Sequence, residues 1–334
     1  MRWLHSYLID FTSLIVISIA VYFILFSQMA EEKLSFHISD SFLQLNTIFL
    51  SIIIEAIPFV LIGVLIAGFI QVFVTEEHIR RLIPKNRFFA VLVSCFVGAL
   101  FPACECGIVP IVRRLVEKGV PLHAGVGFLL TGPLINPIVI LSTYMAFGNN
   151  SHMAALRMII GFLAALLIAL IISFLFKSNQ LKHTITDLTP SSQTKLRKKS
   201  FILRLDEMVK HSIDEFFDMG KYLIIGAFIA AAVQTYVSTK SLFFFGEGIF
   251  GSSIVMMGLA YFLSLCSEAD AFIGASFRNL VPTSAILSFL IYGPMIDLKN
   301  TIMLLSMFKA RFVFILLIII TFIVLISTSL VSFL

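Results

Sequence analysis

The stretch FPACECGIVP, residues 101–110, places two cysteines, a glutamate and two prolines inside a long apolar run. Proline ends or kinks a helix because it lacks a backbone N–H. A charged side chain at the centre of a bilayer is unfavourable by about 2.5–3.5 kcal/mol even on lenient scales. Irregular, polar backbone persists at that depth only where it is buried in protein or lines a wet cavity. We therefore predict that the helix breaks at this stretch and that the break lines a site.

The composition predicts an all-α polytopic membrane protein. Of 334 residues, 59% are hydrophobic and 13% are charged, and the mean hydropathy is +1.02. A soluble domain carries about 25% charged residues. Runs long enough to span a bilayer recur along the chain and predict about seven to nine membrane segments. These runs are 8–27, 43–74, 88–112, 121–147, 153–176, 216–238, 249–275, 282–308 and 311–333.

The first apolar run is predicted to be a retained membrane helix, because no convincing cleavage site follows residues 11–27. The four cysteines fall within apolar segments, which is not the pattern of a disulfide framework. Most of the basic excess behind the net charge of +5 lies in short loops, as the positive-inside rule expects. The charge therefore needs no nucleic-acid partner to explain it.

Loop charge predicts the orientation of the chain. The basic loop at residues 75–90 is predicted to lie in the cytoplasm. The acidic loop at 28–42 and the neutral loop at 148–151 are predicted to lie outside. The polar, strongly basic residues 177–204 favour a solvated cytoplasmic linker over a lipid-headgroup or regulatory role. The chain is then predicted to divide into an N-terminal helix with an outer loop, a first membrane repeat, the linker and a second repeat: 1–42, 43–176, 177–215 and 216–334.

Residues 88–112 are predicted to form a re-entrant hairpin. Basic loops flank this run on both sides, so a single crossing does not fit the charge rule. A hairpin that enters from the cytoplasm and turns at PACECG leaves 121–147 as the true span. Full spans over 88–112 and 249–275 remain the alternative.

An internal repeat supports this scheme. VPLHAGVGFLLTGPLINP (120–137) matches VPTSAILSFLIYGPMIDL (281–298), and residues 57–73 match residues 220–236 more weakly. Chance similarity between apolar segments is the alternative.

The repeated halves are predicted to be inverted. After a one-residue adjustment, ACECG (103–107) falls opposite LCSEADA (265–271). With the predicted loop orientation the two halves run in opposite directions, an arrangement that places the substrate site of many secondary transporters near the midplane. Arg278 is the exception, because this scheme places it outside.

Cys104, Glu105 and Cys106 are the first candidate site residues. Thiols are soft ligands that suit thiophilic metals and metalloids, and the carboxylate adds charge or carries a proton. Cys266 and Glu268 are predicted to face them from the second repeat. We predict that the three cysteines bind the solute or a metal; the alternative is that they pack as small apolar residues at a tight turn.

Intramembrane carboxyl groups are candidates for proton coupling, since desolvation suits them to proton exchange. We predict this role for Glu55, Glu105, Glu268 and Asp270. For Glu55, a place near the outer interface is the alternative.

Two proline-containing motifs are predicted to interrupt spans near mid-depth. TGPLINP (131–137) ends near Asn136, and YGPMIDL (292–298) ends near Asp297. We predict that Asn136 and Asp297 line the substrate site. Simple kinks are the alternative, and for Asp297 a structural ion pair with Lys299.

The usual catalytic motifs are missing from the sequence. No HExxH, GxSxG or P-loop motif is present, and the seven histidines lack paired metal-ligand spacing. We therefore predict a protein that is not an enzyme and uses no cofactor.

The motifs FPACECGIVPIVRRLVEKGVPLHAGVGFLLTGPLINPIVI (101–140), CSEADAF (266–272) and YGPMID (292–297) resemble the ArsP-type predicted permease family of bacteria. The resemblance covers most of the chain from about residue 43. It implies a multi-pass permease of the bacterial cytoplasmic membrane. Characterised members export trivalent organoarsenicals through membrane cysteines, which match Cys104 and Cys106 here, and Asn136 matches the family's asparagine.

The sequence thus predicts a secondary permease that exports a thiophilic solute, such as a trivalent organoarsenical, with the proton gradient as its energy source. Its partners are predicted to be membrane lipid, the solute, and a second membrane protein or another copy of the chain. A divalent-metal permease for zinc or a similar ion, or the membrane subunit of a transport or metal-sensing complex, remains the alternative.

Overall fold

The computed structural model describes residues 40–75, 77, 79, 83–84, 86–101, 104–176, 180–182, 201–236 and 248–332. Leu45–Leu334 forms one compact unit, and the preceding unit is described only by Asp40–Gln44, the start of the first described helix. The predicted N-terminal helix at 8–27 and most of the basic linker lie outside the described residues.

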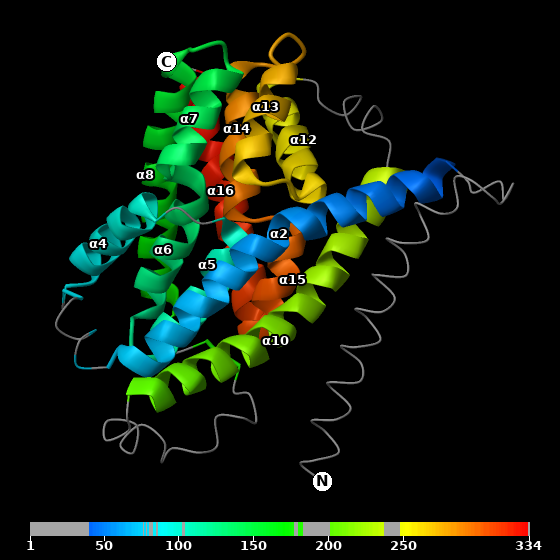
Figure 1. The fold of residues 1–334 in the computed structure, drawn as a ribbon. Coiled ribbons are helices and arrows are strands. Elements are labelled where there is room, and N and C mark those ends of the chain that lie inside the picture. Colours follow the sequence, from blue (N-terminus) through cyan, green and yellow to red (C-terminus); the bar gives the residue numbers. More distant parts are fainter. Residues whose placement is uncertain are drawn as a thin grey trace, which may run out of the picture. The chain divides into compact units, whose positions relative to one another are not determined.

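The described residues are almost entirely helical (Figure 1). In these ranges the only β-type pairing is an isolated bridge between Leu181 and Phe308. The helices are α2 (Asp40–Phe73), α4 (Arg87–Leu100), α5 (Glu105–Glu117), α6 (Leu122–Ile135), α7 (Pro137–Ala146), α8 (Ser151–Leu175), α10 (Phe201–Tyr236), α12 (Gly248–Leu263), α13 (Ser267–Ser276), α14 (Thr283–Met295), α15 (Leu298–Met307) and α16 (Ala310–Val331).

Five stretches of the described chain are long and apolar enough to cross a membrane. They are α2, α6 with α7, α8, α10 from Ile202, and α16. The predicted all-helical membrane fold is confirmed at this level. Helix α10 begins at Phe201, so residues 201–215, which the sequence assigned to the linker, form its first turns.

Four of the predicted apolar segments are each broken into two helices. The breaks separate α4 from α5, α6 from α7, α12 from α13, and α14 from α15. Local chemistry accounts for the starts of α7 and α15. Asn136 and Asp297 are N-caps whose side chains accept a hydrogen bond from a backbone N–H of the following helix. Pro137 at the first position of α7 has no N–H to lose there. Helix α4 ends at Leu100 and α5 begins at Glu105, so the predicted break within residues 101–110 is confirmed.

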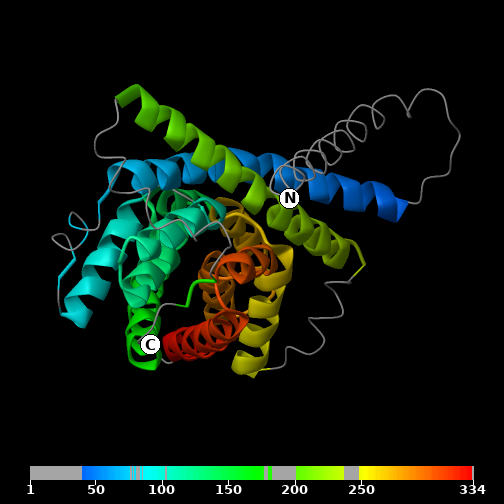
Figure 2. The same cartoon turned by 90° about the horizontal axis from the view of Figure 1, so that it is seen from below.

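Helices α6 and α14 have similar neighbours within the compact unit. Helix α6 contacts α4, α5 and α8, and α14 contacts α12, α13 and α16. The N-terminal half of the chain, up to α8, meets the C-terminal half, from α10 onward, through contacts that include α5 with α15 and α7 with α13. In Figure 1, α12 and α13 lie in the upper part of this unit, whereas α5 and α15 lie in the lower part; Figure 2 gives the view from below.

Helices α2 and α5 approach each other through a pair of glycines. A methyl group on Gly63 would collide with the backbone of Gly107, and one on Gly107 would come within 2.7 Å of the Phe59 carbonyl oxygen. Only glycine permits so close a backbone approach. The contact holds the first turn of α5, which carries the two adjacent cysteines, against α2.

A charge network fixes the other end of α5 to α10. Arg114 pairs with the buried carboxylate of Glu215 at 2.7 Å and with Glu117 at 2.7 Å. Arg113 pairs with Glu117 at 2.9 Å. Helix α5 is therefore held at both ends, by packing at its start and by ion pairs at its end.

Candidate functional site

Four short helices begin at the breaks, each with a polar or thiol side chain at its N-cap. Cys104 precedes α5, Asn136 precedes α7, Cys266 precedes α13 and Asp297 precedes α15. The first turn of a helix presents free N–H groups and a partial positive charge. Three of the four starts, those of α5, α13 and α15, contribute residues to one pocket.

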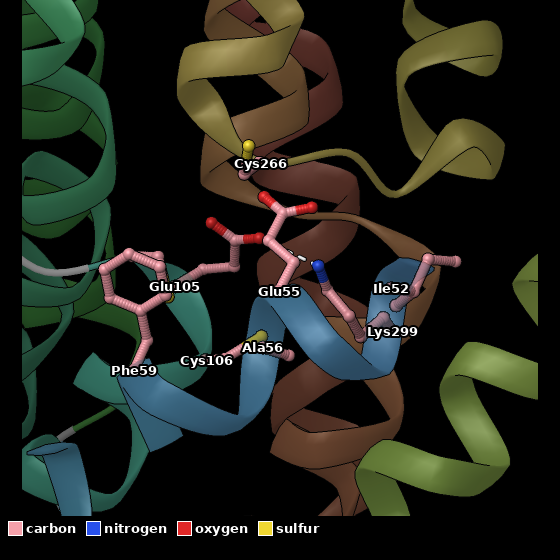
Figure 3. Close-up of a pocket in the computed structure, with 9 residues that line it drawn as sticks. Ile52, Glu55, Ala56, Phe59, Glu105, Cys106, Cys266 and Lys299 are labelled. Carbon is pink, nitrogen blue, oxygen red and sulfur yellow. Dashed lines mark hydrogen bonds and ion pairs between the residues drawn. The ribbon is translucent and has the colours of Figure 1, made fainter. Parts of the chain in front are cut away.

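The pocket lies between the side of α2 and these helix starts (Figure 3). Its free volume is about 10 Å³, enough for one water-sized group at most. In Figure 3 the carboxylate of Glu55, on α2, lies between Cys266 above and Lys299 below. The lining residues are Ile52, Glu55, Ala56, Phe59, Cys104, Glu105, Cys106, Cys266 and Lys299.

Three of the four thiols meet at this pocket. Cys104 and Cys106 are buried, and Cys266 is partly exposed. The Cys106 thiol lies near Cys104, and the Cys266 thiol lies near the Glu55 carboxylate (Figure 3). Cys95 lies elsewhere, buried in α4 with its sulfur against Gly127. The pocket thus combines thiols from both halves with two carboxylates.

Lys299 places a buried ammonium in the same pocket. Its Nζ donates to Glu105 Oε1 at 3.1 Å and to the Ser264 carbonyl at 3.2 Å, and it lies 3.5 Å from Asp297 Oδ2. Ser264 has φ +47°, a left-handed conformation that is uncommon for a residue other than glycine. The ion pair between Asp297 and Lys299, which the sequence offered as the alternative for Asp297, is present, and Lys299 also reaches Glu105, which the sequence did not indicate.

A second buried cation, Arg157, lies on α8 beside α13. Its guanidinium donates to Thr143 Oγ1 at 2.7 Å and to the Ser267 carbonyl at 3.2 Å. Asp270 and Glu268 are near enough to interact with it electrostatically. Neither carboxylate oxygen of Asp270 has a hydrogen-bond partner among the described residues.

The predicted site residues divide into two groups. Glu55, Cys104, Glu105, Cys106 and Cys266 line the pocket, and Asp297 reaches it through Lys299. The other predicted residues, Asn136, Glu268 and Asp270, are not among the lining residues.

The side chain of Asn136 hydrogen-bonds to the backbone on both sides of the break between α6 and α7. It accepts from Val139 N at 2.9 Å and donates to the Gly132 carbonyl at 3.3 Å, so its amide satisfies the backbone at the break.

The described residues contain no group of three or more His, Cys, Asp and Glu side chains placed to hold a metal ion. The pocket thiols are therefore not preassembled as a metal cluster. A metal-ligand role for Cys104, Cys106 and Cys266 stays a prediction.

Sequence reasoning missed Arg157 and the reach of Lys299. A signal for both was present, because a basic residue inside an apolar run is rare unless it faces a partner or a cavity. Arg157 lies within residues 153–176, an otherwise uncharged run up to Phe176.

Comparison with known protein families shows to which family this chain belongs. The ArsP family of predicted permeases matches residues 41–333. The chain belongs to this family. Its membership and its apolar helices together make it a multi-pass membrane protein of a predicted permease family. The resemblance noted from the motifs is thereby confirmed.

Curated relatives cover nearly the same length. The UPF0718 protein YcgR of Bacillus subtilis is 54% identical over 295 residues, which is 88% of this chain and 98% of that protein. A Streptococcus mutans protein, named provisionally as a two-component membrane permease complex subunit, is 41% identical over 277 residues, 83% of this chain and 91% of that protein. No solved structure matches the chain.

Proposed function

We propose that this protein is a secondary permease of the bacterial cytoplasmic membrane that exports a thiophilic solute, with a trivalent organoarsenical as the best candidate. The observation that carries the proposal is the meeting of Cys104, Cys106 and Cys266 in one pocket. Soft thiols suit a metalloid such as trivalent arsenic. The family assignment supplies the permease class.

The pocket chemistry suits reversible capture of a methylarsenic(III) dihydroxide, for which the pocket has to widen beyond its present volume of about 10 Å³. Each thiol proton leaves with an arsenic hydroxyl as water, while an As–S bond replaces an As–O bond. Arsenic stays trivalent and the net charge does not change. Water reverses both steps, so the solute can be released on the other side without any oxidant or reductant.

We further propose that proton movement drives the cycle through the carboxyl groups around the pocket. Glu55 and Glu105 line it directly, and Glu268 and Asp270 lie on the first turn of α13. Burial disfavours the charged form of a carboxyl group, so a buried carboxylate without a partner tends to take up a proton. Asp297 would tune this exchange through Lys299, and Asn136 would support the break beside the site.

Inverted repeats are the architecture that we propose for this cycle, with about seven to nine membrane segments. The contacts of α6 with α4, α5 and α8 correspond to those of α14 with α12, α13 and α16. The motif glycines correspond too: Gly132 lies against Ile108 of α5, and Gly293 lies against Asp270 of α13. Ile108 and Asp270 each stand four residues after a cysteine N-cap.

Single cysteines at the two hairpins test the repeat architecture. We expect Asn86→Cys, before α4, and Asn279→Cys, between α13 and α14, to react with a membrane-impermeant maleimide from opposite sides. Both positions are exposed. The chain without an added cysteine gives the background, since Cys266 is partly exposed. Labelling of both positions from one side would contradict inversion.

Transport into everted membrane vesicles tests the function itself. We expect uptake of methylarsenic(III) that depends on the proton gradient and stops when a protonophore is added, with no zinc uptake under the same conditions. Vesicles from cells that lack the protein provide the background. Zinc uptake alone would favour a divalent-metal permease, and uptake of neither solute would contradict the protein acting alone on these solutes.

A second candidate is that the chain is one subunit of a membrane complex. The name of the Streptococcus mutans relative describes a subunit of a two-component permease complex. A second membrane protein, or another copy of this chain, would then complete the transport path within the lipid bilayer. Co-purification in mild detergent, followed by vesicle uptake with and without the co-purified protein, separates this candidate from a self-sufficient permease.

A further inference from the structure

The ammonium of Lys299 occupies the place in the pocket where a bound cation would be expected. Oxygens from Glu105, Ser264 and Asp297 lie 3.1, 3.2 and 3.5 Å from Nζ. Lysine is a compact point charge on a flexible stem. Because the side chain enters from α15 while Glu105 starts α5, this contact joins the two halves of the protein.

Because the Lys299 ammonium is buried, it interacts strongly with the carboxylates around it. Lys299, Glu105 and Asp297 are each at most 4% exposed. Charges in such surroundings act on each other more strongly than in water. Glu105 Oε2 has no hydrogen-bond partner among the described residues, so Lys299 holds this carboxylate through Oε1 alone.

We propose that Lys299 determines specificity: its tethered ammonium excludes divalent metal ions from the thiol pocket and leaves the thiols available to neutral trivalent metalloid hydroxides. This inference rests on the proposed function for the identity of the cargo. The exclusion itself rests only on the position of the ammonium among the thiols and carboxylates.

The ligands that each solute needs separate the two classes. A methylarsenic(III) dihydroxide bound by two thiols releases two waters and needs no further ligand. A zinc ion bound by two thiols releases two protons, so the net charge of the pocket does not change, but zinc needs two more ligands to complete a tetrahedral site. The nearest carboxylates, Glu105 and Asp297, are already held by Lys299. The ammonium therefore opposes zinc by competing for Glu105 and Asp297.

Zinc binding by the purified full-length protein tests the inference without any transport. We expect Lys299→Gln to bind zinc at least about tenfold more tightly than the unmodified protein in calorimetric titration, because the Glu105 carboxylate that Lys299 holds becomes free to bind the metal. Adding Glu105→Gln to Lys299→Gln should abolish the gain, and Lys299→Arg should not show it. Lys221→Gln is the matched control, since Lys221 pairs with Asp218 on the surface.

Two results would overturn the proposal. One is a zinc affinity that does not change in the Lys299→Gln protein, provided that this variant elutes as a single folded species. The other needs no Lys299 variant: zinc binding by the unmodified protein that Cys106→Ser removes would show that the ammonium does not exclude the metal. Failure of methylarsenic(III) uptake in vesicles would instead contradict the proposed cargo and leave the zinc result standing.

Discussion

Cys106→Ser is expected to lower the initial rate of gradient-driven methylarsenic(III) uptake by about 100-fold or more. At metal sites, the loss of an outer-shell partner alone lowers affinity by about 10–100-fold, and Cys106 would contact the cargo directly. A methylarsenic(III) dihydroxide has two replaceable hydroxyls, and Cys104 and Cys106 are the adjacent pair that can take both places. Serine keeps nearly the same size but offers a hard oxygen in place of the soft sulfur.

Cys95→Ser is the matched control for this experiment. Cys95 is also buried, but it lies in α4 and is not among the pocket-lining residues. We expect its replacement to leave the uptake rate near that of the unmodified protein at equal amounts of protein in the membrane. Retained uptake in Cys106→Ser would contradict a thiol-binding cargo site. An equal loss in Cys95→Ser would indicate a general effect of removing buried sulfur.

The broken helices were predictable because their causes are local. Proline, glycine and polar N-cap residues act within a few positions along the chain, so the apolar runs and their interruptions could be recognised from the sequence. The gathering of Cys104, Cys106 and Cys266 followed from matching the two halves. In the structure the first and third of these cysteines are N-caps of α5 and α13.

The ion pairs of the site were harder to predict because they depend on how separate helices pack. Lys299 and Glu105 are 194 positions apart, and their contact requires α15 to lie against α5. Asn136 has a structural role that the sequence prediction of a site-lining residue did not include: its amide accepts from Val139 N and donates to the Gly132 carbonyl. A polar residue at a helix break has to satisfy the backbone first.

Two buried basic side chains connect the N-terminal and C-terminal parts of the chain. Lys299 contacts Glu105 and Asp297, and Arg157 contacts Thr143 and Ser267. In the inverted-repeat architecture that we propose, rocking of one half against the other would lengthen or exchange these contacts.

Arg157→Met is expected to destabilise the protein by about 3 kcal/mol, the scale of losing hydrogen bonds made by a buried charged group. Arg157 is 2% exposed and Asp270 is 1% exposed. Without Arg157, the carboxylate loses a neighbouring cation, and the Ser267 carbonyl and Thr143 hydroxyl lose a donor. Reversible unfolding in mixed micelles, titrated with a denaturing detergent, measures the change in the free energy of unfolding.

The double variant Arg157→Met, Asp270→Asn shows whether the loss acts through Asp270. Asparagine keeps the size of aspartate, which matters because the Asp270 carboxylate lies against Gly293 of α14. If the uncompensated carboxylate dominates, the double variant should recover most of the stability lost in Arg157→Met. Lys221→Met is the control at an exposed pair, where about 1 kcal/mol or less is expected. Equal losses in the single and double variants would show that Arg157 acts through its hydrogen bonds to α7 and α13, and not through the charge of Asp270.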